Sequence, residues 1–84
     1  MAFVEVQAGS VRSGRIAQLR VKLHGLPARE IDRATALSWM ADGHSFVPVK
    51  SGVRLQALQL VEVGEERFIR ADNAMMSEDS LPTL

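Results

Sequence analysis

The side-chain types of a hydrolytic triad stand almost together in the segment Asp42-Gly43-His44-Ser45. A triad needs a nucleophile, a base and an orienting acid in line, and residues this close along a chain cannot readily reach that arrangement. The segment also lacks the strand–turn–helix elbow that presents a nucleophilic serine. A helix that ends at Asp42 and Gly43, followed by a loop histidine and a serine that enters a strand, explains the same residue types. A small enzyme or ligand binder around His44 is therefore the third of three functional hypotheses.

Other patterns that carry chemistry are missing from the 84 residues. The two histidines, His24 and His44, have no metal-ligand spacing, and a chain without cysteine has no thiolate nucleophile and no zinc–thiolate site. The stretch from Gly9 to Gly14 lacks the lysine of a phosphate-binding loop. We therefore predict no catalytic residue, no metal site and no cofactor, and we expect a non-enzymatic protein.

Basic side chains are concentrated in residues 12–24, which include four of them and no acidic residue. Residues 17–24 alternate between apolar and polar side chains, which indicates a half-buried strand with Arg20, Lys22 and His24 on its outer face. Such a row can bind phosphates, so the candidate anion or nucleic-acid ligands are Arg12, Arg15, Arg20 and Lys22. The formal net charge of the chain is zero, however, and no aromatic side chain interleaves the row for base stacking. A solvated strand face, or an edge strand guarded by basic residues, is the alternative.

Trp39 conflicts with the apolar pattern of its own helix. At about 100° per residue, Trp39 falls on the side opposite the apolar residues, which are Ala34, Ala36, Leu37, Met40 and Ala41. One explanation is an intramolecular cover, supplied by the N-terminal strand, by residues 27–31 or by the Met75-Met76 pair. The other is a partner chain, because tryptophan is enriched at binding hot spots. We predict that Trp39 is an interface residue, partly buried between two copies of the chain.

Periodic patterns of apolar residues, separated by turn residues, predict one helix and five short strands. The helix begins after the N-cap Asp32 and ends at Gly43, and Pro48 confines its strand to a sheet edge or to a place where no donor is needed. A parity change near Gln59 indicates either a sheet covered on both faces or a bulge. The predicted strands cover residues 3–6, 17–24, 46–49, 55–63 and 67–70.

This order, ββαβββ, predicts an α+β fold: a small single domain with a curved antiparallel sheet of about five short strands and one helix. The domain covers residues 1–72, whereas residues 73–84 lose periodicity and form a flexible acidic tail. A chain this short has a thin core, for which we predict Leu19, Val21, Leu37, Leu58, Leu60, Val61 and Phe68.

The sequence also limits the setting and the partners. Residues 1–5 lack the basic segment of a signal peptide, and no apolar stretch approaches the ~20 residues that span a bilayer, so we expect a soluble, cytoplasmic protein that does not bind membranes. The first functional hypothesis is a non-enzymatic accessory or interaction domain, which forms a homodimer or binds another protein. The second is a nucleic-acid-binding module that uses residues 12–24.

Overall fold

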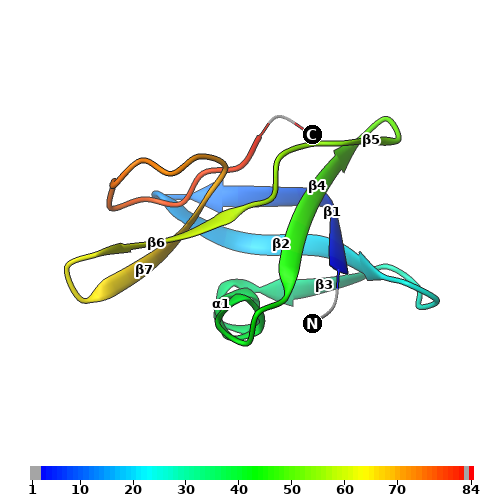
Figure 1. The fold of residues 1–84 in the computed structure, drawn as a ribbon, viewed down its shortest axis with the longest axis horizontal. Helices are drawn as coiled ribbons and strands as arrows, with labels where there is room; N and C mark the ends of the chain where they lie inside the picture. Colours follow the sequence, from blue (N-terminus) through cyan, green and yellow to red (C-terminus); the bar gives the residue numbers. More distant parts are fainter. Residues whose placement is uncertain (1–2, 83) are drawn as a thin grey trace.

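The structure, a computed structural model, describes residues 3–82 and 84 (Figure 1). Within these residues it forms seven strands and one helix. In chain order they are β1 (Phe3–Arg12), β2 (Arg15–Leu23), β3 (Arg29–Asp32), α1 (Arg33–Ala41), β4 (Ser45–Lys50), β5 (Val53–Arg54), β6 (Gln59–Val63) and β7 (Glu66–Arg70). The predicted α+β class is confirmed. No helix in the described residues is long and apolar enough to cross a membrane.

Five strands form one mixed sheet in the order β3-β2-β1-β4-β5, and β6 and β7 form a separate antiparallel hairpin. Within the larger sheet β1 and β4 are parallel, whereas the other neighbouring strands are antiparallel. The prediction of a wholly antiparallel sheet is therefore wrong. The chain forms β2, β3 and α1 before it returns beside β1, and a connection of this length allows two strands to run in the same direction.

Two strands are missing from the predicted order. β3 lies between the strand predicted for residues 17–24 and the predicted helix, and β5 lies between the strands predicted for residues 46–49 and 55–63. β3 has a single buried side chain and β5 has none, so neither shows the apolar alternation that reveals a strand. Conversely, residues 55–58 are not part of a strand. They follow β4 through isolated bonds, in which Leu55 N donates to Pro48 O and Leu58 N donates to Phe46 O, both at 2.8 Å.

The register between β1 and β2 shifts twice. The shift near the start of β2 leaves Ile16 and Leu19 both buried, although they are three residues apart. Ala17, which the alternation predicts to face inward, is exposed. A bulge adds one residue to a strand and so reverses the parity on one side of it, which explains this error.

The ends of α1 follow the predicted caps. The Asp32 side chain accepts the backbone N–H of Thr35 at 2.8 Å. At the other end Gly43 has φ of 95°, and the N–H groups of Gly43 and His44 donate to carbonyls of the last turn at 3.0 and 3.1 Å. This is the Schellman arrangement, in which a left-handed residue lets the chain satisfy the free carbonyls of the helix. Residues 42–45 therefore end the helix and lead into β4, as predicted.

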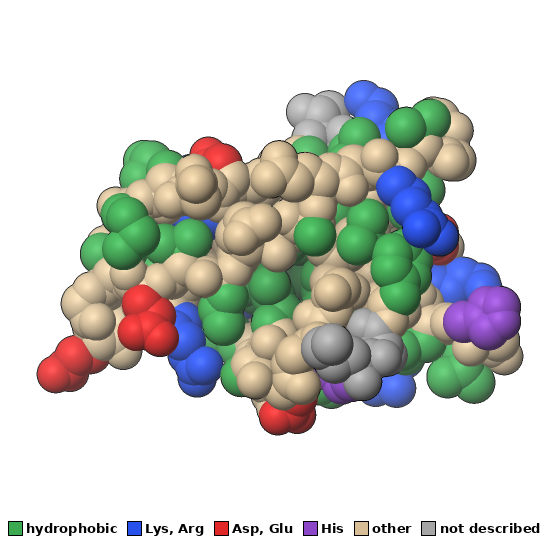
Figure 2. All heavy atoms as spheres, viewed as in Figure 1, with side chains coloured by type: hydrophobic (Ala, Val, Ile, Leu, Met, Phe, Trp, Pro, Cys, Tyr) green, Lys and Arg blue, Asp and Glu red, His purple; other side chains and the backbone are tan. Residues whose placement is uncertain are grey.

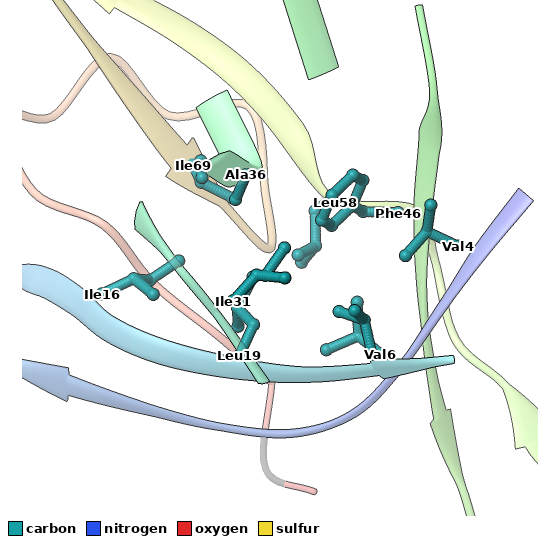
Figure 3. Packing of buried hydrophobic residues seen from close by; sticks show 10 residues of the cluster. Val4, Val6, Ile16, Leu19, Ile31, Ala36, Phe46, Leu58 and Ile69 are labelled. Atoms are coloured by element: carbon teal, nitrogen blue, oxygen red, sulfur yellow. The ribbon is translucent and has the colours of Figure 1, made fainter. Parts of the chain in front are cut away.

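The core lies between the inner face of the larger sheet, α1 and the β6–β7 hairpin (Figure 3). Of the residues predicted for the core, five are buried, namely Leu19, Val21, Leu58, Val61 and Phe68. Leu37 and Leu60 are only partly buried against it. Within α1, which is described in full, Ala36 is the one buried residue, and Ala34 and Ala41 are exposed. The helix therefore meets the core along a narrower face than its apolar pattern predicts.

The sequence predicts a tail over residues 73–84 that is separate from the domain. In the structure, residues 79–81 instead pack against the domain. Asp79 is 4% exposed, and its N–H donates to Gly14 O at 2.7 Å. Ser80 N donates to Ile69 O at 2.9 Å, and Leu81 packs against the core. Because this docking depends on backbone groups and one carboxylate, it leaves no apolar periodicity in the sequence. Residues 79–81 therefore pack against the strands and the core.

Gly9 makes room for this segment. A Cβ atom at Gly9 would lie 2.7 Å from Leu19 Cδ2 and 2.7 Å from Leu81 Cδ1, closer than carbon atoms pack. The absence of a side chain at this point of β1 lets Leu81 lie against the buried face of the sheet.

Candidate anion-binding site

A buried carboxylate joins the two sheets. Asp79 Oδ2 accepts the N–H of Ile16 at 2.7 Å, and Oδ1 accepts the N–H of Ile69 at 3.0 Å. Arg33 donates to both oxygens, through Nε at 2.7 Å and through Nη2 at 3.2 Å. Burial raises the pKa of Asp79, but the hydrogen bonds from Arg33, Ile16 and Ile69 and the charge of Arg33 outweigh burial and hold that pKa below its usual range. These donors are already used within the chain, so this cluster is a structural centre.

Arg15, one of the predicted anion ligands, is engaged beside this centre. Its Nη2 lies 2.7 Å from Glu66 Oε2. The guanidinium carbons of Arg15 and Arg33 also lie 5.4 and 5.6 Å from the centroid of the Phe68 ring, where cations are attracted to the aromatic face. Arg15 therefore holds β2 against β7 rather than presenting a free charge.

The other predicted basic residues are distributed along β1 and β2. Arg12 is the register partner of Arg15 at the turn end of the β1–β2 hairpin, whereas Arg20 pairs with Glu30 of β3 and Lys22 pairs with Glu5 of β1. Cross-strand neighbours of opposite charge stabilise the register of a sheet. The predicted basic row is thus divided among three places, each of which contains a carboxylate.

Lys22 lies in a hollow of about 190 Å³ on the outer face of the sheet. Phe3 and Glu5 line it from β1, Lys22, Leu23 and His24 from the end of β2 and the residue after it, and Arg54 from β5. We name this site the Arg54 hollow. The guanidinium carbon of Arg54 lies 4.6 Å from the centroid of the Phe3 ring, so the cation is stacked over an aromatic face. Figure 2 shows basic side chains gathered beside a histidine at the right-hand end of the molecule.

The two cations of the Arg54 hollow form no ion pair, although Glu5 is the register partner of Lys22. Within the described part of the chain, the arginines that form ion pairs are Arg15, Arg33 and Arg70. Phe3 is 39% exposed and the side chain of Arg54 reaches solvent, so the stacked pair is accessible.

Glu5 offsets only part of this charge. It accepts a hydrogen bond from Gln7 Nε2 at 3.0 Å, and it is the single carboxylate of the lining. Two cations and one carboxylate give the Arg54 hollow a formal charge of +1. A second hollow of about 220 Å³, farther along β1 and β2, contains Arg20 and Glu30 and has no net charge. The positive excess is therefore local.

Sequence patterns indicate Lys22 and His24 but not the other members of the Arg54 hollow. Arg54 belongs to a strand of two residues that has no periodic signal, and Phe3 reads as an ordinary strand residue. The two meet because β4 pairs with β1 and β5 pairs with β4. Strand order is a property of the tertiary fold, so no local pattern could have brought them together.

Trp39, the predicted interface residue, packs within the chain. Its ring centroid lies 6.2 Å from that of Phe46 and 6.3 Å from that of His44. The guanidinium carbon of Arg29 lies 5.5 Å from the indole. Arg29 belongs to residues 27–31, which are one of the covers that the sequence suggests. The indole stays partly exposed, and its role at an interface stays a prediction.

His44 presents its ring edge-on to Trp39, with the two ring planes 79° apart. Among the described residues, no group of three or more histidine, aspartate or glutamate side chains could hold a metal ion. No family model, curated protein or solved structure matches this chain. The functional conclusion therefore depends on the chain's own side chains.

Proposed function

We propose that the chain is a small non-enzymatic interaction domain that binds an anionic group of a partner protein at the Arg54 hollow. The observation that supports this proposal is the pair of cations, Lys22 and Arg54, which line one hollow with the exposed ring of Phe3 and form no ion pair in the described residues. Surface cations usually face water, but here they line a concave site and one of them is held in place. We also propose a cytoplasmic location, which a sequence without cysteine permits.

Stacking gives Arg54 an advantage as a ligand. A free arginine loses conformational freedom when it binds, and that loss reduces affinity. The Phe3 ring already restricts the guanidinium, whose hydrogen-bond donors match the two oxygens of a carboxylate or phosphate. Lys22 adds a compact charge from the other side of β1. Long-range attraction at such a site also steers the partner during encounter.

Nucleic-acid binding along residues 12–24 is the second proposal, and the charge pattern supports it less. A nucleic-acid strand presents a run of phosphates, and its affinity increases with the number of cations along the track. On the outer face of β2, the next cation after Lys22 is Arg20, which lies opposite Glu30. A single anionic group matches a local positive excess better than a run of phosphates does.

Titration with a hexaglutamate peptide at low ionic strength, followed through the amide NMR spectrum, tests the first proposal. We expect the largest shifts at residues 3, 22–24 and 54, and smaller shifts as salt screens the charges. The double variant Lys22→Gln/Arg54→Gln should keep the spectrum of a folded protein and lose the response. A peptide that shifts no amide, or that shifts only amides remote from the Arg54 hollow, would refute the proposal.

A further inference from the structure

The donors of the Arg54 hollow come from strands on both sides of β1. Lys22 and His24 approach from the end of β2, and Arg54 approaches from β5, beyond β4. The exposed Phe3 ring lies under the guanidinium of Arg54. A ligand group in this hollow therefore meets donors from more than one direction.

We infer that the Arg54 hollow receives a phosphorylated side chain of a partner protein. This inference rests on the proposed function and specifies the anionic group. A carboxylate has two oxygens in one plane, and a single guanidinium can satisfy both of them. A phosphoryl group has three acceptor oxygens and a charge of about −1.5 to −2 near neutral pH. It can accept hydrogen bonds from Arg54 and Lys22 together. A carboxylate whose two oxygens are engaged by Arg54 is less able to accept one from Lys22 as well.

The size and openness of the site favour a group on a larger molecule over a free metabolite. Sites that enclose a small molecule have volumes of roughly 300–1,000 Å³ and bury most of the ligand. The Arg54 hollow has about 190 Å³, and the Phe3 ring at its edge is 39% exposed. A phosphoryl group fits such a volume, while the chain that bears it stays on the surface.

The adjacent surface can hold the rest of that chain. Arg20 lies two residues from Lys22, about 7 Å along the strand, and it lines the second hollow with Ser10, Gln18 and Glu30. This second hollow has no net charge, and its lining combines polar side chains with Ala8 and Gly9. It matches a polar residue of an extended segment laid along β1 and β2, next to the phosphorylated residue.

Glu5 makes the inference more specific. Its carboxylate lines the same hollow, so it repels a phosphoryl group while Lys22 and Arg54 attract it. Removing that negative charge should strengthen binding of a phosphorylated peptide, and more so than binding of a peptide with a single carboxylate. Loss of a merely structural side chain would not strengthen binding.

The test is calorimetric titration with a seven-residue glycine–alanine peptide that carries one central phosphoserine. The same peptide with serine or glutamate at the centre gives the comparison. We expect the phosphoserine peptide to bind about tenfold or more tightly than the glutamate peptide, since its charge is nearly twice as large. The serine peptide should show no measurable heat.

Four variants make the test specific. Lys22→Gln and Arg54→Gln should each weaken binding of the phosphoserine peptide about tenfold. Arg54→Lys should also lose a large part of this affinity, although it keeps the charge. Glu5→Gln should strengthen binding of this peptide several-fold, because it removes one negative charge from the hollow. Arg67→Gln removes an exposed arginine of β7 outside the Arg54 hollow and should leave the affinity unchanged within about twofold. The thermal midpoint of each variant verifies that it is folded.

The possible results separate the two proposals. Equal affinity for the glutamate and phosphoserine peptides would overturn the phosphoryl inference and leave the anion-binding function in place. If no anionic peptide binds, both proposals fail. The remaining outcome is that a single-stranded oligonucleotide is the tighter ligand. If it binds more tightly than the phosphoserine peptide, and if substitution of Arg12 and of Arg20 each lowers its affinity, the inference is overturned in favour of nucleic-acid binding.

Discussion

At the residue scale, Asp79 joins β2, α1 and β7 through a carboxylate that is closed to solvent. Asp79→Asn replaces one accepting oxygen with an NH₂ group that faces a donor, and it removes the charge that compensates Arg33. We expect the free energy of unfolding to fall by about 3 kcal/mol, measured by urea denaturation at neutral pH. The control is Glu78→Gln, which changes an exposed carboxyl next in sequence and should cost less than about 0.5 kcal/mol. Equal losses in the two variants would contradict the assigned role of Asp79.

The same carboxylate predicts a pH dependence. Its pKa is lowered in the folded protein, so its contribution to stability is complete above the unfolded value of about 3.9 and is lost as pH falls through the folded value. Hydrogen bonds from Thr35 and from Arg70 lower the pKa of Asp32 and of Asp72 in the same direction. Below about pH 4 the wild type should therefore lose stability steeply, and Asp79→Asn should lose it less steeply without becoming flat. Parallel curves of unfolding free energy against pH for the two proteins would speak against this account.

At the scale of elements, the features that depend on near neighbours could be predicted from the sequence. The caps of α1 belong to this group, as does the apolar side of β2 beyond its bulge. The features that depend on distant partners could not. β3 has four residues and β5 has two, too few for a period, and the parallel pairing of β1 with β4 follows from the path of the chain between them.

The docked segment, residues 79–81, gives the clearest prediction at this scale. Deleting residues 79–84 removes the bonds of Asp79, the bond from Ser80 N to Ile69 O and the packing of Leu81. The loss should be at least the roughly 3 kcal/mol expected for Asp79→Asn, which corresponds to about 12 °C or more in a domain of this size, so the thermal midpoint should fall by that amount or the chain should not fold. Met75→Ser, in the exposed loop before this segment, should leave the midpoint nearly unchanged. A truncated chain that melts at the same temperature as the wild type would contradict this role and support the prediction of a flexible tail over residues 73–84.

At the scale of the whole molecule, the sequence predicts self-association through Trp39. The partly exposed indole, in contact with Phe46, His44 and Arg29, leaves a surface that a second copy could cover. If it does, the mass from light scattering should double with concentration, and tryptophan fluorescence should shift to the red on dilution. Trp39→Ala should then be a folded monomer at all concentrations. A wild type that stays monomeric with blue-shifted fluorescence would make Trp39 a residue of this chain's own packing alone.

Only part of the candidate site could be predicted from the sequence. Its residues come from strands whose order in the sheet does not follow from any local sequence pattern. Lys22 follows from the alternation of β2, whereas Arg54 and Phe3 meet through two strand pairings. Arg12, Arg15 and Arg20 share the basic stretch with Lys22 but lie outside the Arg54 hollow. The prediction of one basic surface was therefore inaccurate, because it combined residues that are close in sequence but that the fold separates.

The most direct test of the account compares hexaglutamate binding by Arg54→Gln and by Arg12→Gln at low ionic strength. Each variant removes one exposed arginine, so the global change in charge is the same. Binding at the Arg54 hollow predicts that Arg54→Gln raises the dissociation constant about tenfold and that Arg12→Gln changes it by less than about twofold. Equal losses in the two variants, or a larger loss in Arg12→Gln, would contradict the account.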